Sequence, residues 1–381
     1  MSRIYVKEVS TEHEMNDFVR LPRRLYAGNP YYVPDLEQDI RETFDSRKNA
    51  ALDFSDIQAF VAYDEAGQPV GRIAAIINHH ANQKWATRNV RFGFIEFTDD
   101  LQVSAALLDA AARWGQERGM EAIVGPMGIF DFDKEGMLVE DFDRPGSSIT
   151  IYNPPYYPRH LEAHGFRKEV DWVQARIRVP EEVPPRYART TRLACELYGL
   201  RVRKLTDEDL EKRDYGHRVF RLLNEAYAPL YGYTELEDRQ IDEYLHRYLP
   251  ILDRRLVPIV ENAEGELVGV AITLPSLSEA LQKSGGRMWP LGWFHLLRAL
   301  KWKRADTADL YLVAVRPDYQ GLGVNALFFS DLIPIYNKLG FRYAETGPQL
   351  EDNVKELGQW APLHPEIIKR RRCYKKVIGS E

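Results

Sequence analysis

The amino-acid sequence predicts an α/β fold with a mixed sheet, arranged as two similar units in tandem. The chain of 381 residues is 44% hydrophobic and 28% charged, which suffices for two domains with a core each. Short apolar segments rich in β-branched residues alternate with longer segments of helical periodicity. The order of these segments in the first half recurs in the second half, and this repetition predicts the tandem arrangement.

Each predicted unit begins with a strand and a capped helix. A Thr followed three residues later by an acidic residue forms a capping box or a near variant of it, and marks a helix N-terminus. The predicted strands are residues 4–9 and 200–205, and the capping pairs are Thr11 with Glu14 and Thr206 with Asp209.

A hairpin follows in each unit, and then a strand, a helix and a further strand. Gly-containing turns join the two apolar segments of each hairpin. The later helix ends near Gly119 in the first unit and near Gly340 in the second. The predicted strands are residues 60–63, 70–77 and 92–97, and residues 257–260, 267–272 and 310–315.

A Pro-rich segment separates the two units. Residues 180–185 read Pro-Glu-Glu-Val-Pro-Pro, which is typical of a linker, and a helix is predicted over residues 187–198. We therefore expect a first domain over 1–180, a linker and connecting helix over 181–199, and a second domain over 200–381.

Charge and cysteine content exclude several classes of protein. The net charge of −6 gives no electrostatic case for nucleic acid, and two cysteines build neither a disulfide framework nor a cysteine-based metal site. His79 and His80 have no third ligand nearby, so a solvated turn is the better interpretation. The sequence shows no apolar signal segment and no run of eighteen apolar residues. We expect a reduced, cytoplasmic protein without metal and without an integral membrane segment.

The most informative segment of the sequence is residues 310–325. An apolar strand leads into a turn marked by Pro317, two glycines follow at Gly321 and Gly323, and a helical pattern then begins. In such a loop the backbone N–H groups can point at an anion, and the helix dipole adds positive partial charge. The segment therefore predicts a site for a phosphate or pyrophosphate.

Two other phosphate-binding loops fit this segment less well. No Gly-Lys-[Ser/Thr] follows the glycines, which excludes a P-loop. The dinucleotide fingerprint needs three glycines, and it tolerates an alanine at the third position, where Ala326 stands. Spacing alone leaves that interpretation open, but such a loop normally follows the first strand of a domain.

Residues 315–324 resemble the acyl-CoA loop of the GNAT acyltransferase superfamily. Gln320 and Gly323 match the core pattern [Gln/Arg]-x-x-Gly-x-[Gly/Ala], whereas Asn325 departs from its small final residue. A second departure is Pro334, which we expect to kink or end the helix. The repeated order of elements is also that of a GNAT unit, so the resemblance implies two tandem GNAT-like acyl-CoA acyltransferase domains. The C-terminal part of the chain is similar to a bacterial branch of tandem GNAT proteins.

The resemblance implies acetyl-CoA or another acyl-CoA as co-substrate, and it indicates which residues would bind it. In this superfamily the backbone at a splayed strand end binds the pantetheine arm, the Gly-rich loop binds the pyrophosphate, and an Asn after the fifth strand faces the pantetheine. The corresponding residues are Val313, Ala314, Val315, Gln320, Gly321, Leu322, Gly323, Val324, Asn325 and Asn353.

The first unit carries a different loop at the matching position. Residues 98–102 contain no glycine, and Asp99 and Asp100 place two carboxylates at the helix N-terminus. There they stabilise the helix and would repel a phosphate. We expect the first unit to be a degenerate copy that binds no CoA.

Acyl transfer to an amine requires a base, because the free amine has a pKa near 10. Glu345, Glu351 and Asp352 lie on or beside the strand that flanks the expected acyl site, and each is also compatible with a solvated or structural role. GNAT enzymes often use a Tyr on the helix after the fifth strand as the acid. The corresponding helix, 354–360, has none, and Tyr374 or Tyr311 is the candidate instead.

Two further segments have several interpretations. By resemblance, residues 224–233 would line the acceptor side. Residues 285–304 combine three Trp with five basic residues at roughly helical spacing. They could form a lid over an apolar site, a helix lying on a membrane surface, or a helix packed on the other domain.

The sequence thus predicts an N-acyltransferase that moves an acetyl or longer acyl group from acyl-CoA to an amine of a small molecule, with the second unit as the catalytic one. A homodimer is compatible with this prediction. The alternative is a non-catalytic acyl-CoA-binding or regulatory protein, which the missing helix tyrosine favours. The acidic net charge speaks against a transferase that uses aminoacyl-tRNA.

Overall fold

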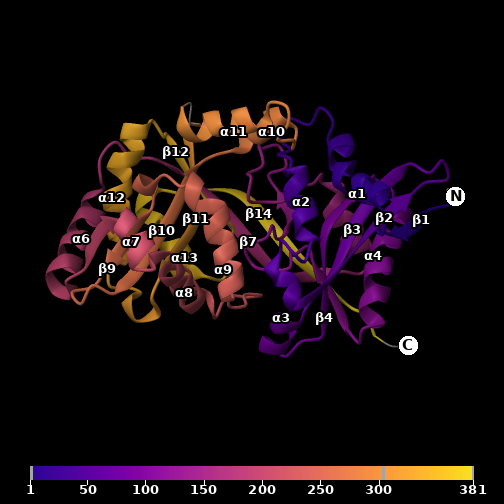
Figure 1. Ribbon diagram of the computed structural model, residues 1–381, viewed down its shortest axis with the longest axis horizontal. Coiled ribbons are helices and arrows are strands. Elements are labelled where there is room, and N and C mark those ends of the chain that lie inside the picture. Colours follow the sequence, from indigo (N-terminus) through magenta and orange to yellow (C-terminus); the bar gives the residue numbers. More distant parts are fainter. Residues whose placement is uncertain (1–2, 303–304, 380–381) are drawn as a thin grey trace. The chain divides into compact units, whose positions relative to one another are not determined.

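The computed structural model describes residues 3–302 and 305–379 of the chain (Figure 1). Two compact units are distinguished by their internal contacts. Unit 1 comprises Met1–Val173, Leu277–Leu296 and Lys369–Glu381, and unit 2 comprises Gln174–Ser276 and Leu297–Ile368. Each unit therefore contains segments from both halves of the sequence.

Unit 1 is a mixed sheet with helices packed on it. Its elements are β1 (Tyr5–Glu8), α1 (Glu12–Leu25), α2 (Glu37–Thr43), β2 (Ser55–Tyr63), β3 (Pro69–Asn78), α3 (His79–Lys84), β4 (Asn89–Phe97), α4 (Leu101–Gln116), β5 (Ala122–Gly125), β6 (Met137–Glu140), α5 (Tyr156–Ala163), α10 (Ser278–Ser284) and most of β14 (Glu366–Val377). The strand order is β1-β2-β3-β4-β5-β14. Only β4 and β5 run parallel in this series.

Unit 2 has a sheet of the same kind. Its elements are the end of β7 (Arg167–Arg178), α6 (Pro185–Tyr198), β8 (Arg201–Lys204), α7 (Asp207–Lys212), α8 (Tyr215–Tyr227), α9 (Asp238–Tyr248), β9 (Pro258–Glu261), β10 (Leu267–Pro275), β11 (Thr307–Val315), α12 (Val324–Leu339), β12 (Tyr343–Thr346), β13 (Gln349–Leu350) and α13 (Val354–Gly358). The strand order is β7-β12-β11-β10-β9-β8. Here the parallel pair is β11 and β12.

The order of elements predicted for a tandem α/β protein is confirmed in both units. Both capping boxes form, because the hydroxyls of Thr11 and Thr206 accept from the backbone N–H three residues on. The carboxylates of Glu14 and Asp209 accept in return from the N–H groups of the two threonines. The helix predicted after the linker is α6.

A large part of the core of each unit lies between its sheet and the helix that follows the central strand, and unit 1 has a second cluster around Phe18 and Val19 of α1. The helix after the central strand is α4 in unit 1 and α12 in unit 2. Its apolar side chains are buried against the strands, which accounts for most of the stabilisation expected from such an amphipathic element. They include Val103, Leu107 and Ala111 on α4, and Leu327, Phe328 and Leu332 on α12.

Helix α12 continues through Pro334 to Leu339, so the expectation that this proline ends the helix was wrong. A proline leaves the carbonyl of the fourth preceding residue, here Ser330, without its helical donor. Pro334 is on the exposed side of α12, where water can reach that carbonyl. The neighbouring Leu332 and Ile333 are buried and hold the helix on the sheet.

Candidate functional site

The two parallel strands of unit 2 separate partway along their length. β11 pairs with β12 from Thr307 to Leu310, and a last bond joins the Gly347 N–H to the Leu310 carbonyl. Tyr311 is the irregular position at which the pairing with β10 shifts register. Beyond it β11 still pairs with β10 as far as Val315, but no longer with β12. This is the splayed strand end expected from the sequence.

Tyr227 contacts the open edge of β11. Its hydroxyl lies 3.0 Å from the carbonyl oxygen of Val313, to which it donates, and 3.3 Å from the N–H of the same residue. Tyr227 is the last residue of α8 and lies in the segment predicted to line the acceptor side. A ligand amide that bonds to Val313 would replace this hydroxyl.

The loop after β11 turns sharply into α12 at two glycines. Gly321 and Gly323 have φ values of +83° and +93°, which side chains rarely adopt. A Cβ at Gly321 would meet nothing within 4 Å, whereas a Cβ at Gly323 would be 3.0 Å from the Thr190 side chain on α6. Gly323 thus permits close helix packing, and Gly321 leaves the loop open on its outer side.

Backbone donors are available at this loop. The N–H groups of Gly321, Gly323, Val324 and Asn325 have no hydrogen-bond partner among the described residues. The cap residue of α12 is Gly323, which has no side chain to satisfy them. Together with the positive end of the helix dipole, these donors form a site for an anion.

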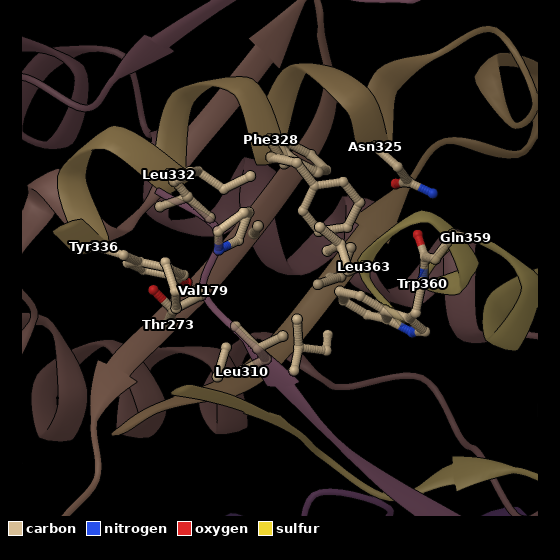
Figure 2. Close-up of a pocket in the computed structure, with 17 residues that line it drawn as sticks. Val179, Thr273, Leu310, Asn325, Phe328, Leu332, Tyr336, Gln359, Trp360 and Leu363 are labelled. Carbon is tan, nitrogen blue, oxygen red and sulfur yellow. The ribbon is translucent and has the colours of Figure 1, made fainter. Parts of the chain in front are cut away.

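An apolar cavity extends from this loop along α12 (Figure 2). It contains about 550 Å³ of space not filled by atoms, part of it open to solvent. One wall is α12, another is formed by β10, β11 and β12, and the segment around Trp360 closes a third side. The lining residues include Ala271, Leu310, Val313, Phe328, Leu332, Ile333, Tyr336, Ala344, Trp360 and Leu363.

Unsatisfied amide groups lie at one end of the cavity. The Oδ1 atom of Asn325 and both amide atoms of Gln359 are buried without a hydrogen-bond partner among the described residues. Figure 2 shows these two side chains at the same end, with Tyr336 and Thr273 at the other. A buried amide without a partner costs about 1–3 kcal/mol, so this end is suited to a ligand with amide groups of its own.

These features fit an acyl-CoA. The free N–H groups suit its pyrophosphate, the amides of Asn325 and Gln359 suit the two amides of its pantetheine arm, and the apolar cavity suits an aliphatic chain. Of the residues predicted to bind CoA, Val313 and Asn325 line the cavity. Asn353 is half-buried just before α13 and is not among the lining residues, and Gln359 was not singled out from the sequence.

The predicted catalytic residues Glu345, Glu351 and Tyr374 have different surroundings. Glu345 on β12 accepts from the Arg176 guanidinium at 2.8 Å, and Glu351 is half-buried in the turn before α13. Tyr374 belongs to unit 1, where it is buried and its hydroxyl donates to Glu162 at 3.2 Å. Only the two glutamates share unit 2 with the loop.

Asp309 is a buried carboxyl group that the sequence analysis missed. It is 2% exposed, lies on β11 and is the register partner of Glu345 on β12. Burial, together with the negative charge of Glu345, raises the pKa of Asp309 to about 7. A signal was present in the sequence, because Asp309 is the one charged residue in an otherwise apolar strand.

In unit 1 the matching loop is occupied by its own side chains. Asp100 accepts from the N–H of Gln102 at 2.8 Å and caps α4, while Asp99 lies 2.9 Å from Nε2 of His160. The other ring nitrogen of His160 is 2.9 Å from the Ser104 hydroxyl. This series has the order of a catalytic triad, but Ser104 is fully buried and its hydroxyl cannot reach a substrate.

The sequence analysis also missed a buried carboxyl group in unit 1, that of Glu96. Glu96 on β4 accepts from the hydroxyls of Tyr26 and Tyr157 at 2.5 and 2.8 Å. Burial raises the pKa of Glu96 to about 7, against the lowering effect of Arg72 and the two hydroxyls. The network connects the C-terminal end of α1 with β3, β4 and α5. The side chains of Tyr26, Arg72, Glu96 and Tyr157 are all less than 9% exposed, which is typical of a structural group.

The described residues were compared with what a metal site and a membrane-spanning helix require. No group of three or more His, Cys, Asp or Glu side chains is arranged there to hold a metal ion. His79 lies 2.9 Å from Asp56 in an exposed pair. No helix within the described ranges has the length and hydropathy needed to cross a bilayer.

We predict different consequences for alanine at the two loop glycines. Gly323→Ala introduces a Cβ into contact with Thr190 and Ala194, so it should lower the free energy of unfolding by about 1–3 kcal/mol. Gly321→Ala meets no neighbour and should cost only the strain of its positive φ, about 1 kcal/mol. Urea denaturation of both variants measures the difference, and equal losses would contradict the packing assigned to Gly323.

Comparisons with known proteins agree with this geometry. No protein-family profile matches the chain. It is 30% identical over 317 residues to the bacterial ceramide synthase of Caulobacter vibrioides. The aligned region covers 82% of this chain and 80% of that protein. It is 28% identical over 393 aligned positions to protein YghO of Escherichia coli, covering 98% and 95% of the two chains.

Solved structures show the same fold. A tandem GNAT protein from the clavulanic acid biosynthesis pathway superposes with a TM-score of 0.57 over 100% of both chains, at 12% identity. A GCN5-related N-acetyltransferase from Sphaerobacter thermophilus has a TM-score of 0.53 at 12% identity, covering 99% of this chain and 96% of that one. The chain therefore belongs to the family of the bacterial ceramide synthase, and it has the fold of a tandem GNAT protein.

Proposed function

We propose that this protein transfers a fatty acyl group from acyl-CoA, bound to unit 2, to the amine of a long-chain amino alcohol. The observation that carries the proposal is the apolar cavity along α12, which is lined by Asn325 in the first turn after the anion-binding loop. The Caulobacter relative is a ceramide synthase by name, and a ceramide is the amide of a fatty acid with a long-chain amino alcohol. Both features favour an aliphatic acyl group over acetyl.

The extent of the apolar lining along α12 favours a long acyl chain. Lining residues occur on α12 from Asn325 to Tyr336, and eleven residues of helix span about 16 Å. An acetyl group would leave most of that length empty. Each methylene of a fatty chain transferred from water to such a lining contributes about 0.8 kcal/mol, so affinity should increase with chain length until the cavity is filled.

The proposed reaction begins with attack of the amine nitrogen on the thioester carbonyl. A C–N bond forms, the nitrogen loses a proton, and the C–S bond breaks to release CoA as a thiolate. The N–H of Val313, once a ligand has displaced Tyr227, is a donor for the developing oxyanion. We assign the protonation of the thiolate to the hydroxyl of Tyr227, a role for which the sequence analysis named Tyr374 or Tyr311.

Asp309 is the residue that we propose as general base. A base is most effective when its pKa lies near the working pH, and that of Asp309 is raised to about 7. Glu345, which Arg176 holds in place, supplies the negative charge that contributes to this shift. Asp309 is 2% exposed and does not itself line the cavity, so in this scheme the proton reaches it by relay through water. In this scheme Glu345 positions and tunes the base.

The first test is turnover. Wild-type protein incubated with palmitoyl-CoA and sphinganine should release free CoA thiol and form an amide, whereas acetyl-CoA should be a poor donor. Thermal shift with palmitoyl-CoA alone reports binding separately, and a ligand at a hundredfold its Kd stabilises by about 2.7 kcal/mol. Binding without release of thiol over a panel of amines would favour the acyl-CoA-binding alternative. Absence of both would refute the proposal.

The second test concerns the cavity. Leu332→Trp fills part of it and should move the preferred acyl chain to a shorter length, with the affinity for palmitoyl-CoA reduced at least tenfold and that for short acyl-CoA retained. The matched control is Lys338→Trp, an equal aromatic substitution at an exposed position of α12. Calorimetric titration with acyl-CoAs of increasing length measures both. An unchanged chain-length profile would mean that the acyl group lies elsewhere.

The third test uses Asp309→Asn, which removes the ionisable group and keeps its shape. The pKa of Asp309 in the folded state is raised above 3.8, so the folded protein retains a proton that the unfolded chain has released between about pH 4 and 7. Stability is therefore lost as the pH rises through this interval. By linkage the loss is roughly 4 kcal/mol above pH 7, and the Asn variant should escape it.

Two measurements follow for this variant. Urea denaturation should show Asp309→Asn to be more stable than wild type at pH 8, with the difference shrinking toward pH 5. The turnover rate should fall by at least a hundredfold, and the wild-type increase in rate with pH near 7 should disappear. A more stable variant that retains full activity and the same pH profile would show that Asp309 is buried without being the base.

A further inference from the structure

Exposed aromatic side chains gather on the segment that contains α10 and α11 (Gly292–Lys301). We call Trp289, Leu291, Trp293, Phe294 and Trp302 the aromatic patch; their exposed fractions are 78, 60, 42, 39 and 67%. These five side chains are a third of the fifteen exposed large apolar side chains among the described residues, yet they lie within fourteen positions of the sequence. Exposure of this much apolar surface in one place marks an interaction site.

The base of this segment is fixed to unit 1. The Gln282 side chain donates to the carbonyls of Pro30 and Tyr32 at 2.9 and 3.0 Å, and the Glu37 N–H donates to the Gly286 carbonyl at 2.8 Å. A Cβ at Gly286 would come within 2.4 Å of the Asp35 carbonyl oxygen. The segment is thus held by specific contacts on one side, and the aromatic patch is exposed on another.

The charge of this segment is opposite to that of the whole protein. No Asp or Glu occurs from Gly285 to Trp302, whereas the chain carries a net charge of −6. Arg287, Arg298 and Lys301 are all exposed. Lys303 and Arg304, which complete the five basic residues noted in the sequence, lie outside the described residues.

Aromatic and basic side chains share one face of α11. Phe294, Arg298 and Lys301 are spaced i, i+4 and i+7, which places them on one stripe of the helix, and all three are exposed. Trp302 follows directly after the helix. Side chains of these two kinds on one face suit the boundary of a lipid bilayer, where indole and phenyl rings lie at the depth of the headgroups and basic groups contact the phosphates.

We infer that the aromatic patch and its three basic residues dock this protein on the surface of an anionic lipid bilayer. α11 has ten residues and is about 15 Å long, too short to span a membrane, so it would lie in the plane of the interface. A second copy of the chain would bring the basic residues opposite one another with no acidic partner on the segment. A nucleic acid would meet an acidic protein. The bilayer matches both the aromatic and the basic side chains.

This inference does not depend on the proposed acyl transfer, but the two fit together. A long-chain amino alcohol and the amide formed from it are poorly soluble in water and reside in bilayers. Docking at the bilayer surface would therefore bring the enzyme to its acceptor. The acyl-CoA, which is anionic and more soluble, could still arrive from the aqueous side.

The test is co-sedimentation of the full-length protein with vesicles of phosphatidylcholine, alone or mixed with phosphatidylglycerol. Wild-type protein should bind the mixed vesicles, and more weakly in high salt. Arg298→Gln with Lys301→Gln should reduce the partition coefficient on mixed vesicles about thirtyfold, or about fivefold per basic residue. Trp289→Ser with Trp293→Ser should reduce binding to both kinds of vesicle at any salt concentration.

Matched controls separate this surface from general effects of charge and hydrophobicity. Arg113→Gln with Lys338→Gln removes two exposed positive charges elsewhere, and Trp85→Ser removes an exposed tryptophan elsewhere; both variants should bind as the wild type does. Thermal unfolding confirms that each variant is folded. Wild-type protein that does not sediment with anionic vesicles would overturn the inference. So would light scattering that shows a dimer dissociated by the tryptophan substitutions, because a second copy would then cover the patch.

Discussion

The separation of β11 from β12 after Leu310 is the constraint on which the rest of the site depends. While the strands are paired, their backbone groups satisfy one another, and once they part the groups of Val313 need another partner. In the structure that partner is the Tyr227 hydroxyl. Val313 also lines the apolar cavity beneath α12. The polar edge that the separation exposes is therefore continuous with the apolar space.

The two units have the same kind of fold but differ in the residues of one turn, the turn before α4 in unit 1 and before α12 in unit 2. Both have a parallel strand pair followed by a helix, and both bury an apolar core beneath that helix. In unit 2 the turn into the helix is made by glycines, and its N–H groups stay available. In unit 1 Asp100 satisfies the helix N-terminus and Asp99 contacts His160. Carboxylates at that place stabilise the helix, and the same charge would repel a phosphate.

Several features could be predicted because they depend on residues close in sequence. The capping boxes at Thr11 and Thr206 join groups three residues apart, and the Gly-rich turn needs only a strand before it and a helix after it. For Asp309 the sequence carried only the signal of one charged residue in an apolar strand, and for Gln359 none, because the surroundings of both residues come from other elements. Asp309 owes its raised pKa to burial and to Glu345 on the adjacent strand, and sequence distance says nothing of either.

By itself, therefore, the sequence determined the order of strands and helices, its repetition and the Gly-rich turn into α12, since these follow from periodicity and turn chemistry. Only the tertiary structure decided which side chains surround that loop. It assigned the final strand with Tyr374 to unit 1, brought Gln359 to the cavity beside Asn325, and left the aromatic patch of α11 exposed. Such outcomes depend on which surfaces pack against one another, and packing is set by contacts between residues far apart in the chain.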